Sequence, residues 1–146
     1  MKKLLAGFAV LFLSNTALAE CVFDVDVGDN LAYSVSEITV DKTCAEVTIN
    51  LKHTGTLPAT AMGHNWVLTN TADVAALGTA GMGAGPQNNY VPVDDSRVFA
   101  NTKIIGGGES TSVTFSIADL DPAGDYTYFC SFPGHWAAMK GTFKIS

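Results

Sequence analysis

Polar and apolar residues alternate along two stretches of the chain, residues 46–51 (EVTINL) and 112–117 (SVTFSI). A period of two is typical of a β-strand that has one buried face and one face in solvent. Other short segments are β-branched or aromatic and are bounded by Gly, Pro, Asp or Asn, which also favours strands. These segments lie near residues 22–27, 38–40, 66–68, 126–129 and 142–145.

Short strands separated by turn signals predict an all-β protein, an antiparallel sandwich or barrel with Greek-key connections. Residues 71–90 (TADVAALGTAGMGAGPQNNY) do not fit this pattern. Asp73 is placed to cap a short helix over residues 74–77, and the glycine-rich part that follows is a poor former of regular structure. We therefore expect an insertion outside the barrel that contains a short helix.

A turn signal precedes one of the expected strands, in residues 120–126 (LDPAGDY). This pattern is similar to the tyrosine corner of sandwich folds, in which the tyrosine hydroxyl bonds to a nearby backbone group. The alternative is a plain turn followed by Tyr126 as a core aromatic residue.

The first 19 residues have the pattern of a secretory signal peptide. Two lysines precede an apolar run over residues 4–13, and a small-residue site follows at Ala17-Leu18-Ala19. The apolar run is shorter than the roughly 20 residues of a membrane-spanning helix. Lipid attachment at Cys21 is disfavoured because Glu20, which is not a small residue, precedes it. We expect cleavage after Ala19, a single domain over residues 20–146, and a periplasmic location.

The charge of the remaining chain excludes some partners. Loss of Lys2 and Lys3 lowers the basic count from 8 to 6 against 14 acidic residues, so the net charge becomes 6 − 14 = −8. An acidic domain without a basic cluster is a poor ligand for nucleic acid or for anionic membranes. Three cysteines remain, and an odd cysteine in an exported protein is a reactive thiol, an intermolecular bridge or a metal ligand.

Potential metal ligands are concentrated in residues 129–141 (FCSFPGHWAAMKG). Cys130 follows an expected strand, and a Phe-Pro-Gly turn separates it from His135 and Met139, so that one loop can direct all three side chains to one point. Thiolate and thioether ligands suit Cu(I), and imidazole suits Cu(II) well. Zinc sites, in contrast, make little use of a thioether.

A second histidine, His64, precedes an expected strand in residues 61–66 (AMGHNW). Two histidines and one cysteine form the trigonal ligand set of a blue-copper site, and a methionine adds the weak axial ligand. His53 has no other ligand type near it in the sequence, so we expect a structural role. Trp66 is expected to be a core aromatic residue.

These motifs resemble those of the azurin family of bacterial blue-copper proteins, which belongs to the cupredoxins. The resemblance spans essentially the whole chain after residue 19. It is most specific in residues 62–68 (MGHNWVL), 94–98 (DDSRV), 113–115 (VTF) and 129–141. The gaps of four residues from Cys130 to His135 and three from His135 to Met139 are azurin-like. The resemblance implies an eight-stranded Greek-key barrel with an external flap, for which residues 71–90 are the natural candidate.

The resemblance also implies particular residue roles. It pairs Cys21 with Cys44 in a disulfide, which leaves Cys130 for the metal. It places Asn65 in hydrogen bonds between the ligand loops, and it directs the backbone N–H groups of Asn65 and Phe132 at the Cys130 sulfur. It implies one type 1 copper ion with five ligands: Gly63 (through its carbonyl), His64, Cys130, His135 and Met139.

The implied function is that of an electron carrier that cycles between Cu(II) and Cu(I) and shuttles single electrons between redox proteins such as c-type cytochromes. The family docks its partners through an apolar patch around the exposed histidine. The candidate patch residues here are Leu31, Leu57, Met62, Met82, Phe132, Pro133, Ala137 and Ala138.

Two alternative functions, copper storage and copper-enzyme catalysis, make different demands on the sequence. A copper-storage protein often carries Met- or Cys-rich tracts, which this chain lacks. A copper enzyme needs additional histidines for a catalytic copper, and only His53 remains after His64 and His135 are used. We therefore expect no enzymatic activity.

Overall fold

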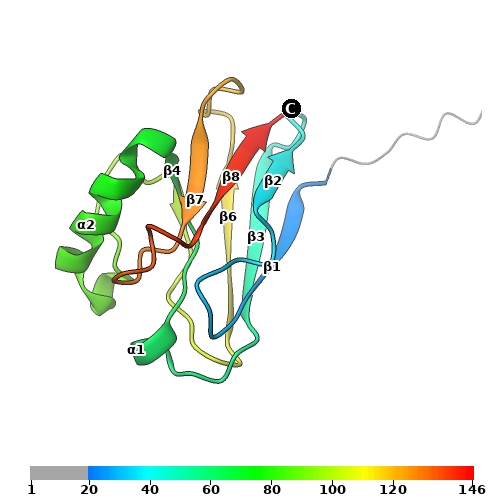
Figure 1. Ribbon diagram of the computed structural model, residues 1–146. Coiled ribbons are helices and arrows are strands. Elements are labelled where there is room, and N and C mark those ends of the chain that lie inside the picture. Colours follow the sequence, from blue (N-terminus) through cyan, green and yellow to red (C-terminus); the bar gives the residue numbers. More distant parts are fainter. Residues whose placement is uncertain (1–19) are drawn as a thin grey trace, which may run out of the picture.

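Two β-sheets face each other in the computed structural model, which describes residues 20–146 (Figure 1). One sheet has the strand order β1-β3-β6, and the other has the order β2-β8-β7-β4-β5. The strands are β1 (Val22–Val27), β2 (Glu37–Val40), β3 (Glu46–His53), β4 (Val67–Asn70), β5 (Ala100–Asn101), β6 (Ser110–Ser116), β7 (Tyr126–Phe129) and β8 (Lys140–Ile145). These eight strands confirm the predicted all-β class. The expected signal peptide, residues 1–19, lies outside the described residues.

The pairing of the strands differs from the expected antiparallel arrangement in two places. β1 runs parallel to β3, and β2 runs parallel to β8, whereas the other pairs are antiparallel. A parallel pair needs a crossover connection. Between β1 and β3 the chain crosses to the other sheet to form β2. Alternation along a strand predicts which face is buried but not which partner the strand takes.

The main core lies between the sheets. Inward-facing residues of β3 alternate with outward-facing ones, so Val47, Ile49 and Leu51 are buried. Trp66 is buried among them and stacks on Tyr128, with ring centroids 5.5 Å apart. The prediction that Trp66 is a core residue is therefore confirmed.

A second, smaller core lies under α2 (Val74–Ala84), which covers the outer face of β4 and β7 (Figure 1). This cover explains why all four residues of β7 are buried, without the alternation of a half-exposed strand. The cluster consists of Val67, Val74, Leu77, Val91 and Phe129, with Val98 and Trp136 at its edge.

The predicted external helix is longer than expected. It follows a 3-10 turn, η1 (Thr71–Asp73), and ends only at Gly85, whose φ is +72°. Asp73 makes no side-chain capping bond. Glycine weakens a helix in isolation, but Gly78 and Gly81 lie where α2 approaches other segments too closely for a Cβ atom. Tertiary packing thus stabilises the helix despite its glycines.

Three further features were not predicted or were predicted wrongly. The short helices α1 (Ala59–Met62) and η2 (Pro86–Asn88) had no clear sequence signal. The tyrosine corner is wrong, because the Tyr126 hydroxyl makes no hydrogen bond within residues 20–146. The Tyr126 ring instead lies against Gly124, where an added Cβ would be 2.4 Å from Cζ. The alternative of a plain turn before a core aromatic residue therefore holds.

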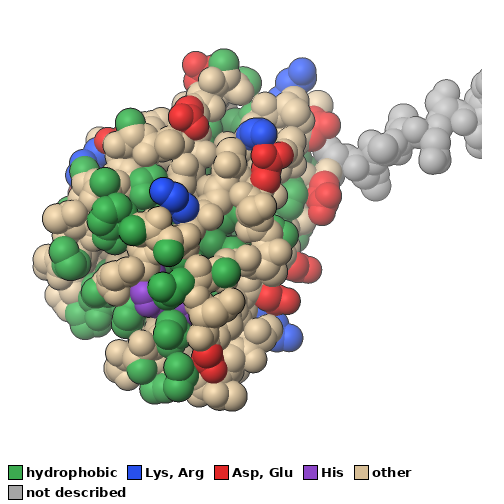
Figure 2. Space-filling model, in the orientation of Figure 1, with side chains coloured by type: hydrophobic (Ala, Val, Ile, Leu, Met, Phe, Trp, Pro, Cys, Tyr) green, Lys and Arg blue, Asp and Glu red, His purple; other side chains and the backbone are tan. Residues whose placement is uncertain are grey.

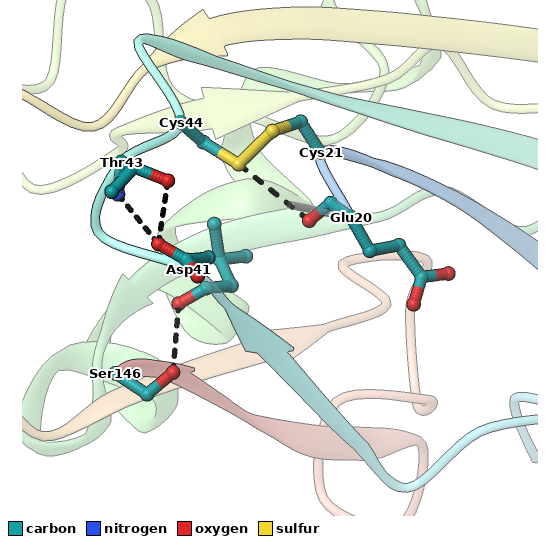
Figure 3. Close-up of a disulfide and its surroundings, with 7 residues drawn as sticks. Glu20, Cys21, Asp41, Thr43, Cys44 and Ser146 are labelled. Atoms are coloured by element: carbon teal, nitrogen blue, oxygen red, sulfur yellow. Dashed lines mark hydrogen bonds between the residues drawn. A yellow bond between two sulfur atoms is a disulfide. The ribbon is translucent and has the colours of Figure 1, made fainter. Parts of the chain in front are cut away.

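The disulfide joins Cys21 to Cys44 and so ties the start of β1 to the loop before β3 (Figure 3). Closing a chain segment of this length stabilises a fold by roughly 3 kcal/mol in the chain-entropy model. Asp41, in the same loop, accepts hydrogen bonds from the backbone N–H and hydroxyl of Thr43. The implied pairing is confirmed, and Cys130 is a free, buried cysteine. None of the helices within residues 20–146 has both the length and the apolar character needed to cross a bilayer.

Candidate metal centre

Three metal-ligating atoms converge at one point in the protein. The Cys130 Sγ lies 3.7 Å from Nδ1 of His64 and 3.6 Å from Nδ1 of His135. The three ligand atoms are all within 4.8 Å of one another, and all three residues are buried. The structure therefore brings together the motifs at residues 61–66 and 129–141, although they are about seventy residues apart in the chain.

The separations suit a single metal ion. Metal–imidazole and metal–thiolate bonds of about 2.0 and 2.3 Å, directed trigonally, would place nitrogen and sulfur about 3.7 Å apart. The observed nitrogen–sulfur distances of 3.6 and 3.7 Å match this value. One soft thiolate with two imidazoles is a donor set that suits copper in both oxidation states.

His64 is held by the backbone of its neighbours. Its N–H and C=O both bond to Ile105, at 3.0 and 2.9 Å, in an isolated β-bridge. Its Nε2 donates to the Gly28 carbonyl at 2.8 Å, so the proton is on Nε2 and the Nδ1 lone pair faces Cys130. Burial lowers the His64 pKa, which keeps the ring neutral.

His53 packs against His64 and supports its position. Its Nε2 contacts the Met62 carbonyl at 3.0 Å, its Nδ1 accepts from the Gly55 N–H, and its ring stacks on His64 with centroids 5.1 Å apart. Because both ring nitrogens have backbone partners, His53 has the expected structural role.

Cys130 follows β7 directly, and its N–H donates to the Met139 carbonyl at 3.1 Å. Burial raises the pKa of the Cys130 thiol to about 11. The backbone N–H groups of Asn65 and Phe132 point at the sulfur, as the resemblance implied, and they lower this pKa in part. The thiol is therefore protonated in the absence of a cation, and a bound metal takes the place of the proton.

His135 lies in the loop between β7 and β8. Its N–H bonds to the Phe132 carbonyl, and its own carbonyl accepts from Ala138 and Met139 at 3.1 and 2.8 Å. Burial, and then the neighbouring His64, lower the His135 pKa to about 4, so the ring is a neutral ligand at pH 7. No residue within 20–146 hydrogen-bonds to its Nε2.

Asn65 joins the two ligand segments. Its Oδ1 accepts from the Ser131 N–H at 2.9 Å, and its Nδ2 donates to the Ser131 hydroxyl and the Asn89 carbonyl at 2.8 and 3.0 Å. Sequence reasoning found Asn65 but missed Ser131, although its place next to Cys130 was a usable signal. It also missed Asn89 and the Gly28 carbonyl, which only the folded backbone brings to the site.

Gly63 and Met139 lie beside the three converging ligands. The Gly63 carbonyl oxygen is 3.9 Å from the Cys130 Sγ. A Cβ on Gly63 would be 2.4 Å from the Ala59 carbonyl, so only glycine allows this approach. Met139 is buried in the same core cluster as Cys130.

The surface around the site is apolar. Figure 2 shows hydrophobic side chains gathered around exposed histidine atoms. His135 is 6% exposed, whereas His53 and His64 have no exposed surface. Leu31, Leu57 and Met82 are 40%, 40% and 53% exposed. The other expected patch residues, Met62, Phe132, Pro133, Ala137 and Ala138, are all exposed or half-buried.

Comparisons with known proteins agree with this site. The family model for copper-binding proteins of the plastocyanin/azurin family matches residues 19–146. The azurin of Bordetella pertussis is 50% identical over 146 residues, covering 99% of this chain and 97% of the relative. Azurin-1 of Alcaligenes xylosoxydans xylosoxydans is 54% identical over 127 residues, covering 87% of this chain and 98% of the relative.

A solved structure, the azurin Az-iso2 of Methylomonas sp. strain J, has a TM-score of 0.85 and 49% identity, covering 88% of this chain and 99% of its own. The similarity thus extends over the whole described fold, including both ligand segments. The chain belongs to the plastocyanin/azurin family of copper-binding proteins, and copper is its cofactor.

Proposed function

We propose that the protein is a periplasmic electron carrier with one type 1 copper ion bound by His64, Cys130 and His135. In this proposal Met139 and the Gly63 carbonyl would complete the ligand set. The observation that carries the proposal is the convergence of the two Nδ1 atoms on the buried Cys130 sulfur. Bound copper supplies a one-electron Cu(II)/Cu(I) couple.

The contribution of the chain is rigidity. Contacts within the chain hold two of the ligands: a β-bridge and the Gly28 carbonyl hold His64, and a backbone bond to the Met139 carbonyl holds Cys130. Asn65 locks the two segments together. A ligand set that moves little between oxidation states keeps the barrier to electron transfer low. The N–H groups at the Cys130 sulfur withdraw electron density from it and favour Cu(I).

Electrons leave and enter through the edge of His135, which is 6% exposed, whereas His53 and His64 have no exposed surface. Figure 2 shows hydrophobic side chains around the histidine atoms that reach the surface. A small apolar docking face suits short-lived encounters with redox proteins, which use interfaces at the low end of the size range. We infer that the partners are c-type cytochromes and similar carriers, and that the protein catalyses no substrate turnover.

The test is the rate of electron exchange. Reduced copper protein, mixed with an oxidised c-type cytochrome in a stopped-flow instrument, should pass its electron rapidly. An intact blue site that transfers no electron would favour the alternative function, copper storage.

A pair of matched variants tests the docking face. Leu57→Asn removes an exposed apolar side chain of the patch and should slow the transfer several-fold. Val22→Asn removes a comparably exposed one at the far end of β1 and should leave the rate unchanged. Equal rates in the two variants would contradict docking at the patch.

A further inference from the structure

The imidazole of His135 is positioned without a hydrogen bond to its outer nitrogen in the described part of the chain. Its Nδ1 lies 3.6 Å from the Cys130 Sγ, and its ring packs between those of Phe132 and His64, with centroids 4.6 and 5.1 Å away. Trp136 follows His135 directly, and its indole packs at the edge of the small core under α2 rather than in the main core with Cys130. The side chains of His135 and Trp136, which are neighbours in the sequence, therefore pack in different parts of the molecule.

The anchor of Trp136 is Gly78, in the middle of α2. A Cβ atom on Gly78 would lie 2.4 Å from Cγ, 2.6 Å from Cδ1 and 2.7 Å from Cδ2 of Trp136. The indole thus rests directly on the helix backbone, and no side chain larger than glycine fits beneath it. Glycine weakens a helix, so its presence here is explained by this contact.

The start of the loop between β7 and β8, which carries His135, also lies against α2 and the segment that follows it. A Cβ on Gly81, one turn after Gly78, would be 2.2 Å from the Tyr90 carbonyl and 3.7 Å from the Ser131 carbonyl. The Ser131 hydroxyl lies 3.3 Å from the Asn89 carbonyl. Both Ser131 and Trp136, which flank the Phe-Pro-Gly turn, are therefore placed against α2 and the segment after it.

We propose that Trp136 is a positioning residue for the copper site: its contact with Gly78 anchors the ligand loop to α2 and so holds the imidazole of His135 at donor distance from Cys130. The proposal rests on the proposed copper site. It makes the external flap, which contributes no ligand, a part of the structure that keeps the site rigid during electron transfer.

The test compares Trp136→Ala and Gly78→Ala, which break the same contact from opposite sides. Changes to residues that orient metal ligands lower metal affinity by about 10- to 100-fold, and we expect a loss in this range in each variant. The visible absorption band that arises from sulfur-to-copper charge transfer and the reduction potential of the copper ion should shift as well. The effects should not add in the double variant, because the first change already removes the contact.

Two control variants distinguish loss of the contact between Trp136 and Gly78 from a general effect of changing the helix. Gly83→Ala adds a methyl group to the same helix at a position with nothing within 4 Å, so it should leave the copper site unchanged. Trp136→Phe keeps a flat ring on Gly78 and should restore part of the affinity. It also provides a folded variant if Trp136→Ala does not fold.

A second measurement needs no copper. In the metal-free protein, the amide groups of residues 131–139 should exchange hydrogen faster in Trp136→Ala and Gly78→Ala than in the parent or Gly83→Ala. If the amides stay protected and the spectrum, affinity and potential of these variants equal those of the parent, the proposal is wrong. Additive effects would also overturn it. Failure of the proposed function would appear separately, as a parent protein that forms no blue site with copper. The hydrogen exchange of the metal-free variants would still report whether the contact between Trp136 and Gly78 holds the loop.

Discussion

His64 and His135 present the same Nδ1 atom to Cys130 at nearly the same distance, 3.7 and 3.6 Å, but they are held by different means. His64 has a β-bridge to Ile105, a carbonyl partner for its Nε2 and a stacked ring on its other side. His135 lies in a loop, where its backbone bonds to residues of the same loop and its ring packs on Phe132. The barrel itself fixes one ligand, and a loop packed against the barrel fixes the other.

The difference suits an electron carrier. The outer ligand must reach the surface, and exposure is incompatible with the enclosure that holds His64. Packing by Phe132 and Trp136 keeps the loop in place while one edge of His135 stays accessible. The consequence is that changes in the loop should affect His135 through backbone conformation and packing, whereas changes around His64 should act through hydrogen bonds.

The largest effect on stability is expected at Asn65, which bonds the segment that contains His64 to the segment that contains Cys130. Asn65→Ala leaves the buried Ser131 N–H without its partner, which should lower the free energy of unfolding by about 2–3 kcal/mol. Urea denaturation of the metal-free protein measures this. Asn50→Ala removes an exposed amide bonded to Asp24 and should cost less than about 0.5 kcal/mol. Equal losses of unfolding free energy in the two variants would mean that Asn65 does not join the two ligand segments.

A smaller effect is expected at Gly134, in the turn before His135. Its φ of +83° is left-handed, so Gly134→Ala should cost about 1–2 kcal/mol through the backbone alone, since nothing lies within 4 Å of the new methyl group. Gly108 has φ +80° and equal space in a turn away from the ligands. Gly108→Ala should lower stability similarly, but only Gly134→Ala should move the copper absorption band. A shift in both variants would show that the band reports general strain.

The smallest effect is expected at Asp29 and should depend on pH. Its carboxylate accepts N–H bonds from Thr56 and Leu57, which lower its pKa, and it adjoins Gly28, the partner of His64. A carboxyl with a lowered pKa stabilises the fold above its ordinary pKa of 3.8, and the contribution is lost as pH falls through the folded value.

Asp29→Asn should therefore be less stable than the parent at neutral pH, and the difference should narrow below pH 3.8. Thermal unfolding of the two metal-free proteins across this range is the measurement. A difference that stays constant with pH would contradict a role for the carboxylate charge.

β1 and β7 were predicted at their observed bounds from their β-branched and aromatic composition, although all four residues of β7 are buried. The alternating segments 46–51 and 112–117 predicted β3 and β6 with bounds that differ by one or two residues at one or both ends. The parallel pairs β1–β3 and β2–β8 and the two-residue β5 were not predicted, because pairing depends on segments distant in the chain. The length of α2 was underestimated because its glycines are read locally as breakers, whereas the fold uses two of them for close contacts.

The candidate site divides in the same way. The candidate side-chain ligands are visible in the sequence, since Cys130, His64 and His135 are rare residue types in compact motifs. Their supporting groups are largely main-chain atoms, such as the carbonyls of Gly28 and Asn89, and a carbonyl has no signature in a sequence. The contact between Trp136 and Gly78 could be found only from the packing of α2.

The central claim is that the Cys130 sulfur, held between the two histidines, is the ligand that makes this a blue-copper site. The most direct measurement is the visible absorption spectrum of the metal-free protein titrated with Cu(II), compared with that of Cys130→Ser. The parent should develop one intense sulfur-to-copper charge-transfer band that saturates at one copper ion per chain, and the variant should lack that band even with copper bound. A variant as blue as the parent would contradict the account.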